Sequence, residues 1–391
     1  MAFSVPVGRR AREDGGLNMR SEIIVVGGGL AGACAAAHLA RGGRAVTLLE
    51  RDSHSVNKVC GEFLTAEACE ELVRIGVDVG ELGATKIERL RLVSAHRTVE
   101  TRLPFAAVGL SRAVLDGAVR ECASSEGTDV RMGARVVETS AHGVRLQDRT
   151  FLPAKHVIVA TGKHDLRGTI KRSAPRMKDR KMGFKEHIRL SSKSSFALAG
   201  TVELHIFQGG YAGLLPLGEG IHNFSLTVSS DRWQAAGSNY RSLLDDIFTD
   251  NRLLASRLQG AIPQMDKPLA IGSVPYGYRV WQADTRSIHT WPVGDQTAVT
   301  PSLTGAGMAL ALASGRLVSE HLLSSSPCRE AYIKTLRSTF SRQIAWARLF
   351  ETALEVDFLR IPLFLSAGIA PGLLRTAAHL TRLPSKQRRW T

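Results

Sequence analysis

A glycine-rich turn and an acidic residue near the start of the chain have the types and spacing of a nucleotide-binding motif. The apolar run 23–26 leads into a Gly-x-Gly-x-x-Gly turn, and Glu50 closes a second apolar run at 45–49. Glycines let the backbone approach a pyrophosphate, whose charge the N-terminus of the next helix favours, and the acid accepts hydrogen bonds from ribose hydroxyls. The pattern therefore predicts a dinucleotide-binding strand–helix–strand unit. The residues expected to contact the ligand are Gly27, Gly29, Leu30, Ala31, Gly32, Glu50 and Arg51.

The rest of the chain supplies elements that would position this turn. An apolar strand at 157–160 ends in Thr161-Gly162 and suits a buried parallel neighbour of the first strand. Beyond a basic stretch the pattern becomes strand-rich, which predicts a nucleotide-binding domain interrupted by a mixed β region. Expected helices are 33–41, 65–75, 111–124 with Ser111 as N-cap, 238–258, 304–323 and 329–355. Expected strands are 87–93, 98–103, 130–139, 143–146, 201–207, 224–228 and 271–278.

Composition and cysteine usage limit the class of protein. The chain has 391 residues, of which 44% are hydrophobic and 22% charged, so it can bury large cores in roughly two to three domains. Its five cysteines include no Cys-x-x-Cys pair, which argues against a disulfide framework and a zinc site. Residues 1–20 lack the apolar core of a signal peptide, and residues 1–18 are expected to form a disordered leader. We therefore expect a cytoplasmic protein without a metal site.

The formal net charge of +15 is concentrated in two segments. Residues 163–193 hold eleven Lys/Arg against three acids, and residues 358–391 hold six Lys/Arg and no acid. Such segments attract anionic lipid, the 2′-phosphate of NADPH or an acidic carrier protein, although a generally basic surface is the simpler alternative. Aromatic residues make up only 6% and no nucleic-acid motif is present, so nucleic acid is not an expected partner.

A second glycine-rich stretch indicates which dinucleotide is bound. Gly294-Asp295 is followed by Pro301 and by Gly305-Ala306-Gly307-Met308. With the first motif in this order, residues 20–325 resemble the FAD-dependent oxidoreductases that include p-hydroxybenzoate hydroxylase, flavin halogenases and geranylgeranyl reductases. The resemblance implies that Asp295 holds the ribityl chain of FAD and that Arg112 contacts the phosphates or the ribose. It also implies that residues 305–308 bring a helix N-terminus to the flavin, where the helix dipole stabilises the anionic reduced form.

The resemblance implies a fold and a domain division as well. The expected class is α/β: a Rossmann-like FAD-binding domain of the p-hydroxybenzoate hydroxylase type, interrupted by a mixed β-sheet substrate domain and followed by a helical C-terminal segment. The expected FAD-binding domain comprises residues 19–84, 105–165 and 283–325. The substrate domain comprises residues 85–104 and 166–282, and the C-terminal segment residues 326–391.

A loop shortly after Glu50 is similar to one that geranylgeranyl reductases place beside the flavin. It reads Lys58-Val59-Cys60-Gly61-Glu62. We expect Lys58 and Cys60 to contact the cofactor, and Cys60 and Glu62 to lie near the reacting centre. The alternative is that Cys60 is simply a small buried hydrophobic side chain.

The substrate domain is expected to cover the flavin and to hold the substrate between the two. The stretch 209–216 resembles the family's glycine–aromatic segment at that pocket, and Tyr211, Tyr276 and Tyr278 could hydrogen-bond a phenol or a quinol. His187 could act as a base toward a phenolic proton. Packing within the sheet is the alternative for each of these side chains.

These features predict a flavoenzyme that acts on a hydrophobic small molecule, with NADPH or NADH as electron donor. The Asp-Gly motif that many hydroxylases use for FAD and NADPH is replaced here by Ala160-Thr161-Gly162-Lys163, so hydroxylase-style use of NADPH is in doubt, although Thr161 and Gly162 are still expected at the cofactor. The commonest chemistry of the superfamily narrowly favours a monooxygenase that hydroxylates an aromatic, polyketide-derived or quinone-like substrate through a flavin C4a-hydroperoxide. The Cys-Gly-Glu loop favours a geranylgeranyl-reductase-like reduction of C=C bonds. Electron transfer to a membrane quinone is a third possibility.

The C-terminal segment indicates a further partner. Its uninterrupted apolar stretch, 361–374, is shorter than the roughly 20 residues that span a bilayer. Five Lys/Arg follow it, a pattern that predicts a helix lying in an anionic membrane surface at the inner face of the membrane. The alternative is a hydrophobic helix that covers the substrate pocket, and both suit a lipophilic substrate.

Overall fold

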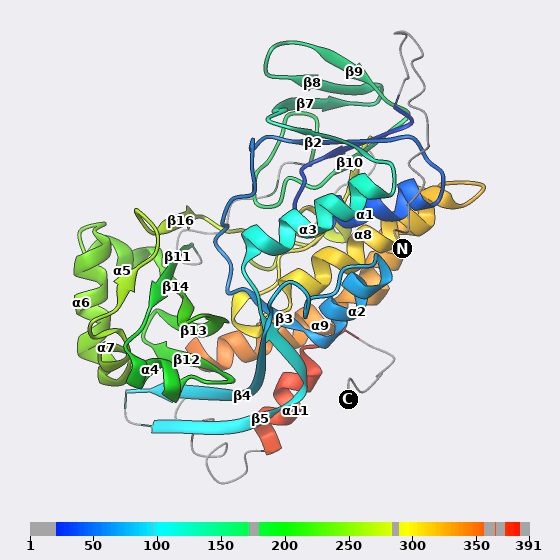
Figure 1. Ribbon diagram of the computed structural model, residues 1–391. Coiled ribbons are helices and arrows are strands. Elements are labelled where there is room, and N and C mark those ends of the chain that lie inside the picture. Colours follow the sequence, from blue (N-terminus) through cyan, green and yellow to red (C-terminus); the bar gives the residue numbers. More distant parts are fainter. Residues whose placement is uncertain are drawn as a thin grey trace, which may run out of the picture.

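The computed structural model describes residues 21–95, 97–170, 172, 180–283, 289–355, 364 and 372–383. The expected leader and most of the apolar C-terminal stretch lie outside the described residues. Two large β-sheets, each covered by helices, form the body of the protein (Figure 1). The expected α/β class, with a Rossmann-like parallel core and a second, mixed sheet, is confirmed.

The first sheet has five strands in the order β17-β10-β1-β2-β6, and its neighbouring pairs are all parallel. Its strands are β1 (Ile23–Val26), β2 (Val46–Glu50), β6 (Asp129–Met132), β10 (His156–Val159) and β17 (Trp291–Pro292). β1 is buried on both faces, because Ile23 and Val25 pack toward helices whereas Ile24 and Val26 pack toward a small three-stranded sheet. That sheet contains β7 (Val136–Ser140), β8 (Gly143–Leu146) and β9 (Phe151–Pro153).

Helices cover the other face of the parallel sheet (Figure 1). They are α1 (Leu30–Arg41), α2 (Ala66–Arg74), α3 (Arg112–Ser125), α8 (Gly307–Leu323) and α9 (Arg329–Glu355). The small side chains of α1 let α8 approach closely: a Cβ atom at Gly315 would lie 2.6 Å from the carbonyl oxygen of Ala31. Because the two helices are in direct contact here, their N-termini are held at a fixed distance and orientation relative to each other.

The second sheet is larger and mixed. Its order is β15-β11-β14-β13-β12-β4-β5-β3, with β16 paired to β11; β12 and β4 pair in parallel and the other neighbours are antiparallel. The strands are β3 (Phe63–Thr65), β4 (Thr85–Ser94), β5 (Arg97–Gly109), β11 (Lys181–Arg189), β12 (Thr201–Phe207), β13 (Gly210–Gly218), β14 (Ile221–Ser229), β15 (Ile262–Pro263) and β16 (Leu269–Gly272).

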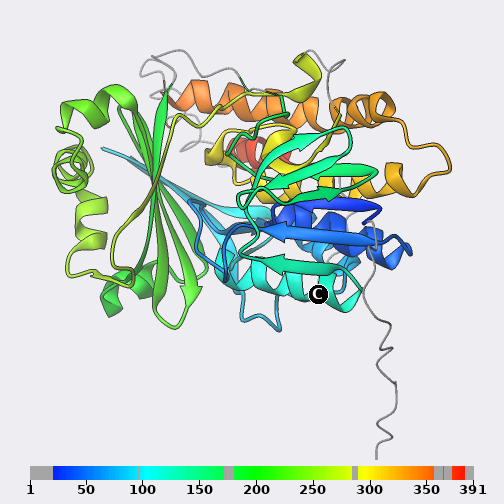
Figure 2. The same cartoon turned by 90° about the horizontal axis from the view of Figure 1, so that it is seen from above.

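The two faces of the mixed sheet have different neighbours. One face packs against α5 (Ser230–Ala235), α6 (Tyr240–Asp250) and α7 (Arg252–Leu258), with α4 (Ser192–Ala197) at its edge, and the other turns toward the parallel sheet (Figure 2). α11 (Gly372–Leu380) lies beside β5 and α9 (Figure 1). Its Leu374 belongs to the same apolar cluster as Leu354 of α9 and Leu92 of β4. The space between the two sheets is therefore closed at one end by α9 and α11.

Four expected elements are divided, shortened or delayed in the structure, each for a local reason. The helix expected at 238–258 is split into α6 and α7 at Asn251, whose side chain accepts the N–H of Leu254 at 3.0 Å and starts a new helix. The strand expected at 271–278 is paired only as far as Gly272, because Ser273 and Gly277 have φ of +54° and +82°. Gly133, with φ of +74°, divides the strand expected at 130–139, and Gly305, with φ of +64°, delays α8 to Gly307.

Candidate active site

A cavity of about 1120 Å³ lies between the two sheets. It begins where β1, β2, β10 and β17 end, and residues from all four ends line it, among them Gly27, Glu50, Thr161 and Gly294. Ligands of open parallel sheets bind at the carboxyl ends of the strands, so this is the expected place for a nucleotide. From there the cavity extends along the mixed sheet to α9 and α11.

The glycine-rich turn after β1 has no room for side chains where it meets the sheet. Gly27 has φ of +108°, and a Cβ atom there would lie 2.5 Å from the carbonyl oxygen of Ala160. A Cβ atom at Gly32 would lie 2.0 Å from the carbonyl oxygen of Gly27. Gly29 is different, since it lines the cavity and its Cβ position lies 3.5 Å from Lys58 Nζ. No side chain caps the N-terminus of α1, so its N–H groups are available to a phosphate.

Glu50 is held in one orientation at the end of β2. Its Oε2 accepts the backbone N–H of Gly28 at 2.7 Å, and its Oε1 accepts that of Asp52 at 3.1 Å. Arg120 supports the same turn by donating to the carbonyl of Gly28 at 2.7 Å. Glu50 and the adjacent Arg51 both line the cavity, so the carboxylate is placed as a ribose-binding acid requires.

Two cations near Gly29 share one carboxylate. Arg112 binds Asp116 through two nitrogens at 2.8 and 3.0 Å, and Lys58 Nζ lies 3.0 Å from the same carboxylate. Burial alone would raise the pKa of Asp116, but the charges of Arg112 and Lys58 hold it below its ordinary value. Because two cations share one anion, a positive charge remains beside the turn, and it favours a pyrophosphate.

The loop after β17 forms the opposite wall of the cavity. Asp295 lines this wall, and the neighbouring Gln296 donates to Thr161 Oγ1 at 3.0 Å and to the carbonyl of Gly162 at 2.8 Å. Arg172 bridges the same two loops by donating to the carbonyls of Gly162 and Asp295 at 3.1 and 3.2 Å. The loops after β10 and β17 are therefore locked to each other.

The N-terminus of α8 also faces the cavity. Gly305 is left-handed, and a Cβ atom there would lie 2.7 Å from the ring of Phe63. A Cβ atom at Gly307 would meet none of the described atoms within 4 Å, and no side chain caps this helix. Gly305, Gly307 and Met308 line the cavity, whereas Pro301 and Ala306 are buried behind the loop.

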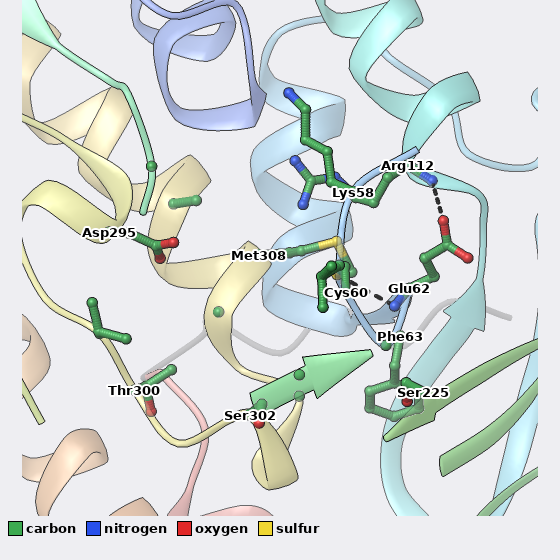
Figure 3. A pocket seen from close by; sticks show the side chains of 18 of the residues that line it. Lys58, Cys60, Glu62, Phe63, Arg112, Ser225, Asp295, Thr300, Ser302 and Met308 are labelled. Atoms are coloured by element: carbon green, nitrogen blue, oxygen red, sulfur yellow. Dashed lines mark hydrogen bonds between the residues drawn. The ribbon is translucent and has the colours of Figure 1, made fainter. Parts of the chain in front are cut away.

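These groups fit FAD from one end of the cavity to the other, and Figure 3 shows Lys58, Arg112, Asp295 and Met308 among them. The turn at 27–29 with its two cations suits the pyrophosphate, and Glu50 suits the adenosine ribose. Asp295 suits the ribityl hydroxyls, and the open N-terminus of α8 suits the flavin carbonyl edge on which negative charge develops. The glycines keep this path free of side chains.

Comparisons with known proteins agree with this fit. Residues 21–199 match the family model described as pyridine nucleotide-disulphide oxidoreductase. The chain is 26% identical to a menaquinone reductase of Mycolicibacterium smegmatis over 386 residues, which are 93% of this chain and 90% of that protein. It is 26% identical to digeranylgeranylglycerophospholipid reductase 2 of Methanopyrus kandleri, with 77% of this chain and 76% of that protein covered. A flavin-dependent brominase shares the fold with a TM-score of 0.74 at 14% identity, covering 92% of this chain and 93% of the other.

The protein is an FAD-dependent oxidoreductase. It shares its fold with flavin-dependent halogenases and with a geranylgeranyl bacteriochlorophyll reductase-like protein of Thermoplasma acidophilum. The remaining side chains of the cavity therefore surround the reacting end of a flavin site.

Cys60 lies at this end of the oxidoreductase's cavity (Figure 3). The side chain is half-buried, and its sulfur accepts the backbone N–H of Glu62 at 3.4 Å. The thiol is thus placed where it can meet both a flavin and a substrate.

Glu62 is fully buried beside Cys60 and joins three parts of the chain. Its Oε1 accepts the backbone N–H of Arg112 at 2.7 Å and Lys185 Nζ at 2.5 Å. Its Oε2 accepts Nε2 of His187 and Nδ2 of Asn223, each at 2.7 Å. Burial alone would raise the pKa of Glu62, but the hydrogen bond from His187 and the charge of Lys185 lower it. The carboxylate is therefore held in its ionised form.

Three hydroxyl groups form a chain on the mixed-sheet side of the cavity. Tyr211 donates to Ser302 Oγ at 2.5 Å, and the Tyr276 hydroxyl lies 3.0 Å from the same oxygen. Burial raises the pKa of Tyr211 well above its ordinary value, so this phenol stays protonated. Tyr278 does not line the cavity; its ring lies 5.9 Å from the Arg172 guanidinium.

The cavity brings most of the expected site residues together. Those that line it are Gly27, Gly29, Leu30, Ala31, Glu50, Arg51, Lys58, Cys60, Glu62, Arg112, Thr161, Gly162, Tyr211, Gly294, Asp295, Gly305, Gly307 and Met308. Gly32, Pro301 and Ala306 support the backbone behind it. His187 reaches Glu62 rather than the cavity, which places it away from a substrate proton.

Sequence reasoning did not find five residues that organise this site, namely Asp116, Arg172, Lys185, Asn223 and Gln296. Asp116 carried a detectable signal, because it follows Arg112 by four residues on an expected helix, where opposite charges pair. Lys185 and Asn223 carried none, since a polar residue on a strand normally indicates the solvent face. Gln296 directly follows the Gly-Asp pair and could have been suspected from its position alone.

None of the described helices is long and apolar enough to cross a bilayer. The expected membrane-surface helix falls largely on residues outside the described part of the chain. Among the described residues, no cluster of three or more His, Cys, Asp or Glu side chains is placed to hold a metal ion.

Proposed function

We propose that this oxidoreductase is a reductase that adds hydrogen across a C=C bond of an isoprenoid-like substrate, such as a prenylated quinone or a geranylgeranyl lipid. Two relatives that match three quarters or more of the chain are named as reductases of menaquinone and of a digeranylgeranyl lipid. Their names support reduction over the hydroxylation that the commonest chemistry of the superfamily favours.

The apolar second half of the cavity is the observation that carries this proposal. Beyond the flavin-binding loops, the walls from β4, β5, β12, β13, α9 and α11 are mostly aliphatic or aromatic. They include Leu90, Leu92, Leu103, Phe105, Val202, Leu204, Leu215, Phe350, Leu354, Leu373 and Leu374. Each methylene-sized group buried there contributes about 0.8 kcal/mol. A chain of isoprene units would therefore bind through many small contacts, without needing a charged partner.

The residues of the chain have distinct tasks in such a reduction. Reduced FAD, when bound, supplies the hydride. The leucine-rich wall excludes water and orients the alkene. Arg112 and Lys58 neutralise the negative charge of the cofactor's phosphates. Cys60 gives its thiol proton to one carbon of the C=C bond as the neighbouring carbon receives the hydride, and the thiolate left behind regains a proton from solvent.

An anaerobic single-turnover experiment tests the proposal. The FAD-loaded protein is reduced with dithionite and mixed with a detergent-solubilised prenylated quinone or geranylgeranyl lipid. The mass of the product is then measured by mass spectrometry. We expect a product that has gained two hydrogens on an isoprene unit. If the substrate instead gains an oxygen atom, and only when O₂ is admitted, the protein is a monooxygenase.

A monooxygenase acting on a phenol or a quinol is the second candidate, and the Tyr211–Ser302–Tyr276 hydroxyl chain favours it. These hydroxyls could hold a ring hydroxyl in the cavity. Tyr211→Phe separates the two functions. It should lower the rate of hydroxylation roughly 100-fold if Tyr211 handles a phenolic proton. It should change alkene reduction by much less, because that substrate has no hydroxyl to hold.

We further propose that NADPH or NADH reduces the cofactor. The three basic or titratable side chains Arg51, Lys163 and His164 line the nucleotide end of the cavity and favour a phosphate-bearing donor. Anaerobic mixing with either nucleotide should bleach the flavin absorbance within seconds. If the flavin is bleached only by dithionite or by a reduced ferredoxin, the donor is a protein.

A further inference from the structure

Arg382 differs from the other charged side chains of the cavity in its surroundings. It lies just beyond the end of α11, lines the cavity, and has a side chain that is only 7% exposed. Its guanidinium carbon lies 4.9 Å from the ring centre of Phe105, in the apolar half. Among the described residues, the other charged side chains that line the cavity surround the path that fits FAD, within 50–62 and at 112, 135, 163–165 and 295. A cation is therefore placed among the side chains that suit an isoprenoid chain.

The guanidinium of Arg382 uses only part of its hydrogen-bonding capacity. Its Nε donates to the carbonyl of Ala378 at 3.2 Å. Its Nη2 donates to the carbonyl of Thr304, and also to Thr381 Oγ1 at 3.1 Å. Its Nη1 is buried and meets no acceptor among the described residues. A buried donor without a partner is unfavourable, so a ligand oxygen that accepted from Nη1 would stabilise this arrangement.

The positive charge of Arg382 is only weakly compensated. Its ion-pair partner among the described residues is Glu67, whose Oε1 lies 3.9 Å from Nε and also accepts the backbone N–H of Leu383 at 3.3 Å. Arg112, by contrast, binds Asp116 through two nitrogens at 2.8 and 3.0 Å. Burial lowers the pKa of Arg382, and the charge of Glu67 opposes this. A further oxygen that carries negative charge would therefore be attracted to this guanidinium.

An apolar wall cannot by itself decide where along its length an isoprenoid chain stops. Hydrophobic contact is non-directional, and successive isoprene units are alike, so a chain displaced by one unit makes nearly the same contacts. One polar contact at a fixed place removes this ambiguity, because it orients the ligand from its head group. Arg382 supplies such a place, since it is bonded to Thr304, directly before the glycine turn at the N-terminus of α8.

We propose that Arg382 binds an oxygen of the substrate's polar head group, a phosphate oxygen or a quinone carbonyl, and so selects which C=C bond of the isoprenoid chain is reduced. The guanidinium binds the substrate and takes no part in the transfer of hydrogen. The selection of a C=C bond rests on the proposed reductase function. Binding of the head group rests only on the cavity and its arginine.

Equilibrium binding to the FAD-loaded, full-length protein tests the head-group contact. The probes are geranylgeranyl phosphate, a naphthoquinone that carries a geranylgeranyl chain, and a hydrocarbon of the same chain without a head group. Gel filtration in detergent that contains the probe, followed by mass spectrometry of the bound fraction, gives each dissociation constant. Arg382→Met keeps the length of the side chain and removes its charge and its donors. Arg375→Met on α11 is the matched control, because Arg375 is exposed and does not line the cavity.

The unaltered protein should bind at least one of the two headed probes about tenfold more tightly than the hydrocarbon, as one charge-assisted hydrogen bond provides. Arg382→Met should remove this preference by weakening the headed probe alone, and Arg375→Met should preserve it. A preference for the phosphate identifies an anionic head group, and a preference for the quinone identifies a carbonyl. Each supports the role of Arg382.

A merely structural role gives another result. If Arg382 only supports the loop at Thr304, Arg382→Met weakens all three probes equally, which overturns the proposal. The absence of any preference for a headed probe overturns it as well. If Arg382→Met does not fold, Arg382→Lys takes its place. The lysine keeps the charge without the planar fork of donors, and it should lose part of the preference while its affinity for the hydrocarbon stays unchanged.

Anaerobic single turnover with the reduced protein tests the selection of the C=C bond. Fragment masses show which isoprene unit of the preferred probe has gained hydrogen. One unit should dominate in the unaltered protein, and Arg382→Met should spread the reduction over several units; an unchanged position would overturn the selection. If the binding preference depends on Arg382 but no alkene is reduced, the proposed function alone fails. If alkenes are reduced at the same position by both proteins and no binding preference exists, only the role of Arg382 fails.

Discussion

The carboxylate of Glu62 caps helix α3 from outside the helix, because the backbone N–H of Arg112 donates to Glu62 Oε1 at 2.7 Å. Ser111 occupies the N-cap position, as its sequence predicted, but its side chain caps nothing and donates to Asn57 Oδ1 at 3.4 Å. One side chain thus starts the helix that carries Arg112 and also shapes the loop that carries Cys60. The phosphate end and the reacting end of the flavin site are coupled through this single residue.

Gly29→Val should weaken FAD binding without unfolding the protein. Gly29 has an ordinary extended backbone, φ −75° and ψ −177°, and its Cβ position meets only Lys58 and Arg112 at 3.5 and 4.0 Å. A valine side chain there would occupy the space of the pyrophosphate. We expect FAD affinity to fall at least tenfold, or about 1.4 kcal/mol, with an unchanged circular dichroism spectrum.

Gly27→Ala is the matched control in the same turn. Its positive φ and the 2.5 Å contact with the Ala160 carbonyl should make it lower the melting temperature of the FAD-free protein, which Gly29→Val should leave in place. Equal FAD retention by Gly29→Val and the original protein would mean that the pyrophosphate lies elsewhere.

Cys60→Ala should slow alkene reduction roughly 100-fold while KM changes little, because the thiol acts on the proton transfer and not on substrate binding. Cys69→Ala on α2 is the control, since Cys69 does not line the cavity. Turnover and KM are measured under identical anaerobic conditions. Unchanged turnover in Cys60→Ala would mean that Cys60 contributes only to packing.

Glu203→Gln should destabilise the mixed sheet in a pH-dependent way. Glu203 is fully buried and binds Arg91 at 2.6 Å, His205 at 2.9 Å and Arg257 at 3.0 Å. Burial would raise its pKa, but these hydrogen bonds and charges lower the pKa of Glu203 to about 2. A carboxyl with a lowered folded pKa stabilises the protein above its unfolded pKa, and this stabilisation is lost as the pH falls toward the folded value.

Urea unfolding at several pH values measures this effect. We expect Glu203→Gln to lose about 3 kcal/mol near neutral pH and the difference to shrink as the pH drops from about 5 toward 2. Glu138→Gln on β7 is the comparison, because its pair with Arg145 is about half exposed and should contribute less than about 1 kcal/mol. A loss that stays constant down to acid pH would contradict the charge explanation.

We propose that the protein associates with anionic membranes through its C-terminal part, and a substitution on α11 tests this. Leu373 on α11 is 51% exposed, lines the apolar cavity and belongs to the basic stretch 358–391 of the sequence. Leu373→Glu should weaken co-sedimentation with vesicles containing phosphatidylserine several-fold, and added salt should weaken it further. Phe196→Glu, on α4 and 85% exposed, should have no effect, because Phe196 does not line the cavity. Equal loss from both variants would argue for a non-specific surface.

The local part of the flavin site could be predicted from the sequence, because each piece is a short motif on one strand–helix junction. The turn at 27–32, Glu50 and residues 294–308 all carry their signal within a few residues of an apolar strand. Their common cavity followed from the family resemblance, since the two motifs are separated by most of the chain.

The long-range part could not be predicted. Glu62 meets Lys185 and Asn223 across 123 and 161 residues, and no periodicity marks a lysine that a strand turns inward. The net charge of residues 163–193 was misleading for the same reason, because Lys185 in the middle of that segment is fully buried. The ends of elements were also missed, at Gly133 where a glycine divides a strand and at Asn251 where an asparagine cap divides a helix.

The separation of Glu62 from Lys185 has a consequence for biosynthesis. A ribosome adds roughly 5–20 residues per second, so Glu62 emerges many seconds before the lysine that neutralises it, 123 residues later. The cavity beside the first glycine turn is likewise incomplete until α8, which forms its second wall, has been synthesised. A nascent chain paused in this interval presents an unfinished parallel sheet and an uncompensated acid to chaperones and proteases. Cofactor loading is therefore a late event that follows translation of nearly the whole protein.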